Sequence, residues 1–156
     1  MNIKSIAKRV KVESTRYRLN LSCTFDVDMQ HLIKTFTNTS LFQQIFSMMN
    51  NLICIKGKNS LDSRNSVFTF DIDSKISKFT VDEVGETEHL YKLKFLFSIL
   101  FDKMVNFIIS FKFYRLTVEE ATYFSMEILY ESYSDLEHFC TYMPMFSLYI
   151  AFGNIY

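Results

Sequence analysis

Glycine and proline are scarce in this chain, whose 156 residues contain three glycines, one proline and no tryptophan. No Gly- or Pro-rich linker divides the sequence, so we expect a single domain with one hydrophobic core. The glycines, Gly57, Gly85 and Gly153, are too far apart to form the glycine-rich loop that holds phosphates in many nucleotide-binding proteins. A loop of that kind is therefore excluded.

An excess of charge of either sign is also missing, because 17 basic side chains balance 17 acidic ones. We expect no nucleic-acid partner, since binding to a phosphate backbone needs a net basic surface. Long apolar runs are missing as well. The longest, residues 95–113, contains Asp102 and Lys103 at its middle. A membrane-spanning helix needs about 20 consecutive apolar residues, so no transmembrane segment is expected.

Paired cysteines are absent, since Cys23, Cys54 and Cys140 are odd in number and widely spaced. Together with the lack of a secretory signal, this predicts reduced, buried thiols and an intracellular protein, cytoplasmic or mitochondrial and not secreted. The three histidines show no metal-ligand spacing. We therefore expect no metal, no cofactor and no catalytic set built on cysteine or histidine.

Aromatic residues are plentiful, but an AT-rich genome gives the same bias, so only their positions carry an argument. Residues 17–27 alternate strictly between apolar and polar side chains, which predicts a half-buried strand. The apolar positions are Tyr17, Leu19, Leu21, Cys23, Phe25 and Val27.

Two short helices are predicted after this strand. Asp28 is placed to cap the first, whose apolar stripe contains Leu32 and Phe36. Residues 37–39 end it. Ser40 and Gln43 then form a capping box for the second helix. Its predicted buried stripe is Leu41, Phe42, Ile45, Phe46 and Met49.

Further strands are predicted from period-two alternation in the rest of the chain. They span residues 52–56, 67–72, 77–84, 91–99, 107–113 and 124–128, with turns near 85–87 and 118–120. Residues 96–109 are apolar enough for a helix, but their aromatic and β-branched content favours strand. Short connections predict a largely antiparallel sheet. A last helix begins at the capping box of residues 134–137 and is kinked or broken at Pro144.

This order of elements resembles the helix-grip fold of the START and Bet v 1-like (SRPBCC) superfamily. The residues that carry the resemblance are strand 17–27 running into residues 28–33, and the start of the closing helix at residues 134–137. The resemblance implies an α+β domain over residues 17–156. In it a curved antiparallel sheet of about seven strands wraps around a long C-terminal helix.

The resemblance further implies a cavity between sheet and helix that holds a hydrophobic small molecule. Its lining would be Tyr91, Leu93, Phe95, Phe107, Ile109, Phe111, Phe124, Met126, Phe139, Met143 and Phe146. The same aromatic residues are equally suited to fill a core, since any sheet packed on a helix needs large apolar side chains.

Three functions are compatible with this fold. The first is non-catalytic binding or transfer of a lipid-like molecule. The second is an accessory subunit of a larger protein assembly, with the cavity filled by side chains. The third, a minor alternative, is a cyclase- or hydratase-like enzyme, which needs a polar group in the cavity; Tyr91 and Tyr123 are the candidates.

Residues 1–16 form a basic N-terminal arm outside the resemblance. Lys4, Lys8, Arg9 and Lys11 fall in a stretch without acidic residues, and apolar side chains recur at helical spacing. This pattern is typical of a short amphipathic helix that contacts a membrane surface or an acidic protein partner. A solvated terminus without such a contact is the alternative.

Overall fold

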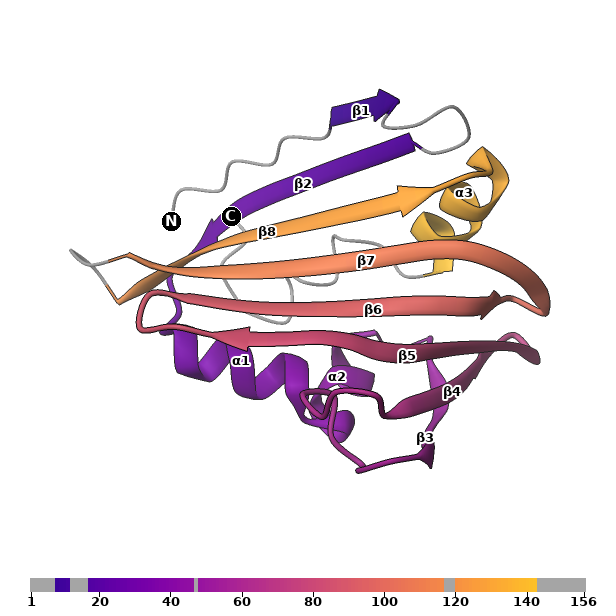
Figure 1. The fold of residues 1–156 in the computed structure, drawn as a ribbon, viewed down its shortest axis with the longest axis horizontal. Coiled ribbons are helices and arrows are strands. Elements are labelled where there is room, and N and C mark those ends of the chain that lie inside the picture. Colours follow the sequence, from indigo (N-terminus) through magenta and orange to yellow (C-terminus); the bar gives the residue numbers. More distant parts are fainter. Residues whose placement is uncertain (1–7, 12–16, 47, 117–119, 143–156) are drawn as a thin grey trace.

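The computed structural model describes residues 8–11, 17–46, 48–116 and 120–142. Eight strands form one antiparallel sheet in the order β1-β2-β8-β7-β6-β5-β4-β3 (Figure 1). The seven predicted strands are confirmed as β2 to β8. The elements are β1 Lys8–Lys11, β2 Tyr17–Phe25, α1 Met29–Thr37, α2 Thr39–Ile45, β3 Asn50–Lys56, β4 Val67–Ile72, β5 Lys75–Glu86, β6 Leu90–Leu100, β7 Lys103–Leu116, β8 Ala121–Tyr130 and α3 Tyr133–Tyr142.

The strand β1 was not predicted. Lys8 pairs with Asn20 and Lys11 pairs with Tyr17, so this part of the basic arm extends the sheet beside β2. The prediction of an amphipathic helix is therefore wrong for residues 8–11, because backbone pairing to an open sheet edge outweighs a weak helical pattern. The remainder of the predicted arm, residues 1–7 and 12–16, lies outside the described residues.

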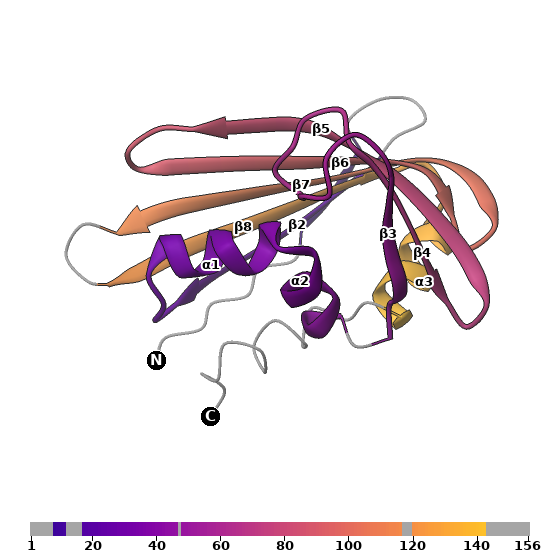
Figure 2. The same cartoon turned by 90° about the horizontal axis from the view of Figure 1, so that it is seen from below.

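The sheet curves, and α1, α2 and α3 all lie on its inner side (Figure 2). The side chains that face the helices are the apolar half of each alternating strand. In β4, for example, Phe68, Phe70 and Ile72 are buried while Val67 and Thr69 are partly exposed. The α+β architecture with a curved antiparallel sheet is thus as predicted. Of the predicted long C-terminal helix, the structure describes the ten residues of α3, and the predicted kink or break at Pro144 lies outside the described residues.

Two tight turns set the register of the central hairpins. Asp73 and Ser74 connect β4 to β5, and Phe101 and Asp102 connect β6 to β7, all with positive φ between 52° and 67°. A two-residue turn with both φ values positive matches the twist of the strands that it joins. The carboxylate of Asp102 also accepts a hydrogen bond of 2.7 Å from the Ile76 amide. The charged interruption in the apolar run is therefore this hairpin turn.

The alternation predicted for β6 fails near its end. The pairing between β6 and β7 shifts between Phe97 and Ile99, which marks a β-bulge. As a result Leu100 is buried, whereas Ile99 is partly exposed. The turn predicted near residues 85–87 also begins later, because β5 continues through Glu86.

Both early helices are capped by side chains. The Asp28 carboxylate accepts a hydrogen bond from the Gln30 amide, as predicted. For α2, however, the cap is Asn38, whose side-chain oxygen lies 3.0 Å from the Leu41 nitrogen, so the capping box predicted at Ser40 is wrong. At the other end of the chain α3 begins at Tyr133, one residue before the predicted cap, Ser134.

Replacing Asn38 with alanine is expected to lower the free energy of unfolding by about 1 kcal/mol, since the first turn of α2 loses its acceptor. Ser40→Ala is the matched control. Its side chain is exposed, so its effect is expected to stay within about 0.5 kcal/mol. Urea unfolding followed by circular dichroism measures both variants. Equal losses for the two would assign the cap to Ser40 after all.

Within the described ranges, no helix has both the length and the apolar character needed to cross a membrane.

Candidate functional site

The predicted site residues up to Phe139 share the inner side of the sheet. They come from three adjacent strands and from α3, and each has at most 3% of its surface exposed: Tyr91, Leu93, Phe95, Phe107, Ile109, Phe111, Phe124, Met126 and Phe139. The remaining two, Met143 and Phe146, lie outside the described residues. Burial alone suits a core as well as a ligand site, so the arrangement of the side chains has to be considered.

Strand pairing places these residues in rows across the sheet. Leu93 is opposite Phe111, which is opposite Met126 on β8. In the next row, Phe95 is opposite Ile109. Side chains directly opposite each other lie about 5 Å apart at their Cβ atoms, so each row forms a continuous apolar band.

Phe36 of α1 covers one end of these bands. Its ring centroid lies 5.3 Å from that of Phe111, 5.2 Å from that of Phe113 and 5.4 Å from that of Phe124. Phe42 of α2 contacts both the Phe36 ring and the Phe95 ring. The helices after the first strand therefore contribute aromatic groups to the interior, which the sequence had assigned only to the core.

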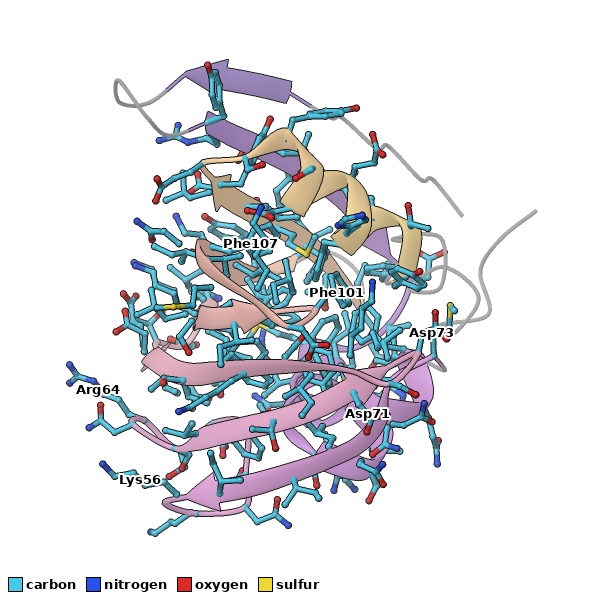
Figure 3. The ribbon with its side chains drawn as sticks, turned by 90° about the vertical axis from the view of Figure 1, so that its right-hand side faces the viewer. Lys56, Arg64, Asp71, Asp73, Phe101 and Phe107 are labelled. Atoms are coloured by element: carbon cyan, nitrogen blue, oxygen red, sulfur yellow. The ribbon has the colours of Figure 1, made fainter. Side chains whose placement is uncertain are left out.

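The helix α3 covers the other end. The ring centroids of Phe139 and Phe107 are 5.3 Å apart, and those of Phe101 and Tyr142 are 5.4 Å apart. Phe101 and Phe107 point toward α3 in Figure 3. The helix is held at its first turn by Asp135, a buried side chain whose carboxylate lies 3.1 Å from the Lys103 ammonium.

Tyr91 is the polar group within this set. Its side chain is 3% exposed, and its hydroxyl has no hydrogen-bond partner among the described residues. Burial raises the pKa of Tyr91 well above its ordinary value, and the nearby carboxylates of Asp62 and Glu86 raise it further. The phenol therefore stays neutral at physiological pH and keeps a proton to donate.

The cavities lined by described residues include three that open on the outside of the molecule. The first, of about 290 Å³, lies over the outer face of the sheet at Lys92 and Ser125. The second lies beside α2 at Gln43, and the third beside the β6–β7 turn at Met104. Leu93 and Phe111 are also among the residues that line the first.

The sequence matches no family model and no curated protein. Solved structures do match. Ara h 8.0201 superposes with a TM-score of 0.61 at 14% identity, covering 88% of this chain and 95% of the other. Truncated norcoclaurine synthase from Thalictrum flavum gives 0.60 at 9% identity, with 97% and 94% covered. Major latex-like protein 151 from Panax ginseng gives 0.57 at 15% identity, with 83% and 93% covered.

This chain has the helix-grip fold. The resemblance predicted from the order of elements is confirmed by these matches, which include Bet v 1-like proteins and the synthase. At such low identities the likeness establishes the fold of the chain and carries no function with it. The helix-grip fold occurs both in non-catalytic binders and in enzymes.

The two tyrosines considered for catalysis lie on opposite sides of this helix-grip sheet. Tyr91 faces the interior, whereas Tyr123 is 37% exposed on the outer face, where its ring centroid lies 5.8 Å from that of Tyr114 in a tilted arrangement. Tyr123 is therefore wrong as a candidate for a group inside the cavity. Successive side chains of a strand point to opposite faces of the sheet. Because Phe124 and Met126 of β8 occupy the inner face, the neighbouring Tyr123 lies on the outer face.

The prediction of buried cysteines holds for one position and fails for two. Cys23 is buried, as predicted, whereas Cys54 is partly exposed and Cys140 is exposed. The buried stripe of α3 passes through Leu136 and Phe139, and Cys140 lies beside it. Burial around the thiol still raises the pKa of Cys140, which disfavours the reactive thiolate. Among the described residues, no group of three potential metal ligands comes together.

Proposed function

We propose that this protein binds or transfers a hydrophobic small molecule, lipid-like in character, held between the inner face of the sheet and the C-terminal helix, without catalysing a reaction. The observation that carries the proposal is the Tyr91 hydroxyl, buried in an aromatic interior without a hydrogen-bond partner among the described residues. An unsatisfied buried polar group costs about 1–3 kcal/mol. A ligand oxygen at this position removes that cost.

The chemistry around Tyr91 defines the ligand further. Because its pKa is raised, the neutral phenol donates a hydrogen bond to a carbonyl, hydroxyl or ether oxygen. Apart from the nearby carboxylates of Asp62 and Glu86, the inner face of the sheet is apolar, so most of the ligand is held by burial at about 25 cal/mol per Å² of apolar area. A molecule with one oxygen and a large apolar body fits this description.

The same features support a binder over an enzyme. A phenol with a raised pKa is a poor general base near neutral pH, since it does not give up its proton. Tyr123, the other candidate, is on the outer face. A bound molecule is released when the helix side of the interior opens away from the sheet. Transfer between membranes or proteins uses the same opening step.

Native mass spectrometry and solvent extraction of the protein purified from its own source test this proposal. A co-purifying apolar molecule in stoichiometric amount is expected. An empty protein that co-purifies instead with stoichiometric protein partners would contradict it and favour an accessory subunit whose interior is filled.

Tyr91→Phe gives a sharper test of the anchor. The variant keeps the ring and its contact with Phe113 at 5.9 Å but removes the hydroxyl. We expect about tenfold weaker ligand retention, because a hydrogen bond is worth about 1 kcal/mol or more, together with a ligand-free form that is about 1 kcal/mol more stable. Tyr123→Phe, on the outer face, is the matched control and is expected to change neither quantity. Unchanged retention in Tyr91→Phe would remove this residue from the site.

A further inference from the structure

The outer face of the sheet carries a groove that is separate from the interior. It has a volume of about 290 Å³ and crosses β2, β8, β7, β6 and β5, which lie side by side in Figure 1. Its walls are polar side chains that alternate with the buried residues described above. No part of the proposed interior function requires this groove, so it calls for a separate explanation.

The three charged side chains in one row of the groove, Glu83, Lys94 and Glu127, all take part in ion pairs. Lys94 lies opposite Ser110, and its ammonium is 3.5 Å from the Glu83 carboxylate. The Glu127 carboxylate in the same row is 3.1 Å from the Arg18 guanidinium. These ion pairs form the polar rim of the groove on both sides.

The neighbouring row holds positive charge without compensation. Lys92 on β6 is directly opposite Lys112 on β7, and neither has an ion-pair partner among the described residues. Like charges directly opposite each other on adjacent strands destabilise a sheet. An anion bound in the groove stabilises such a pair, because it forms charge-assisted contacts with both ammonium groups.

Hydroxyl donors surround the same two lysines. Ser125 is opposite Lys112 on β8, and Ser110 lies one row away, and neither hydroxyl has a hydrogen bond within the described residues. On the other side Gly85 is opposite Lys92, and a Cβ placed there would meet nothing within 4 Å. The absence of a side chain at Gly85 leaves this side of the groove open to a ligand.

We propose that this groove binds the phosphate group of a small phosphate-bearing ligand, with Lys92 and Lys112 supplying the charge and Ser110 and Ser125 supplying hydroxyl donors. The site lies on the opposite face from Tyr91, so it operates whether or not the interior holds a hydrophobic molecule. Two ammonium groups and two hydroxyls complement a dianion with several acceptor oxygens.

Inorganic phosphate is the first probe, titrated into the full chain at constant ionic strength, since the interaction between exposed charges is screened by salt. Binding is followed by isothermal calorimetry and by the rise in melting temperature that a ligand specific for the folded state produces. Saturable binding with one site is expected. Lys112→Gln and Lys92→Gln are each expected to weaken it about tenfold, the loss of one charge-assisted contact.

Lys58→Gln is the matched control, because it removes the same charge from an exposed position in the β3–β4 connection. It is expected to bind phosphate as the wild type does. The variants at the groove are expected to melt at the same or a higher temperature than the wild type, because like-charge repulsion is relieved. Weakened binding would then not be attributable to unfolding. Absence of saturable phosphate binding, or equal weakening by Lys58→Gln, overturns the proposal.

Three further probes distinguish the source of the phosphate: glycerol 3-phosphate, adenosine monophosphate, and phosphatidylcholine vesicles containing phosphatidic acid. The contacting rings of Tyr114 and Tyr123 lie one row beyond Lys112 and Ser125 on the same face. Tighter binding of adenosine monophosphate that is lost in Tyr123→Ala, with phosphate binding retained, identifies a nucleotide ligand. Pelleting with the vesicles that is lost in Lys112→Gln identifies a lipid headgroup. Equal affinity for all soluble probes identifies the phosphate group alone as what is recognised.

Discussion

Phe36→Ala is expected to lower the free energy of unfolding by about 3–5 kcal/mol, a large fraction of the 5–15 kcal/mol typical of a whole domain. The side chain is fully buried and its ring contacts those of Phe42, Phe111, Phe113 and Phe124. Truncation removes the only described ring that joins α1 to three strand rings at once, and leaves a void that the rigid sheet cannot close.

Urea unfolding of the ligand-free protein measures this loss. Met104→Ala is the control for removal of an apolar side chain, because Met104 is 87% exposed at the β6–β7 turn, and its effect is expected to stay below about 0.5 kcal/mol. Phe36→Leu is expected to recover about half of the loss, since it refills part of the volume. A loss below about 1 kcal/mol for Phe36→Ala would show that the ring contacts a yielding, loosely packed region.

Most of the sheet was predictable because each strand buries one face only. In β4 the alternation predicts both bounds of the strand and its buried residues, Phe68, Phe70 and Ile72. The end of β6 was not predictable in the same way. Both odd and even positions near this end are apolar, namely Leu96, Phe97, Ile99 and Leu100. The sequence therefore cannot show where the bulge reverses the faces to which the side chains point. Only the pairing with β7 determines this.

The strand β1 escaped prediction for a different reason. Its residues Lys8 to Lys11 are mostly charged, and charged side chains are typical of edge strands, which avoid pairing with other molecules. Such a strand lacks the alternation of apolar and polar side chains from which a strand is predicted. Its position follows from the free edge of β2, which is visible only once β8 is known to occupy the other side of β2.

The lining of the interior was predictable, whereas its extent was not. Alternation places Phe95, Ile109 and Met126 on one face, and all are buried. The space left between them depends on how α1 and α2 insert Phe36 and Phe42, which no strand pattern encodes. The outer groove was missed because Lys92 and Lys112 come from different strands and become neighbours only through register.

Met126→Trp separates a ligand site from a filled core. Met126 is 1% exposed on the inner face of β8, between Leu21 and Phe111 in the pairing. If a ligand occupies the interior, the indole takes up its space. Ligand retention is then expected to fall at least about tenfold, while the free energy of unfolding of the ligand-free protein falls by no more than about 1 kcal/mol.

A filled core gives the opposite pattern, because an added ring in a packed interior costs about 1–3 kcal/mol through strain. Leu129→Trp is the matched control, since Leu129 belongs to the same strand but lies on the outer face opposite Ile108. It adds the same ring and is expected to leave ligand retention unchanged. Solvent extraction and urea unfolding of the two variants side by side give both quantities. A strongly destabilised Met126→Trp variant, together with a wild type that retains no ligand, would mean that aromatic side chains occupy the volume assigned here to the ligand.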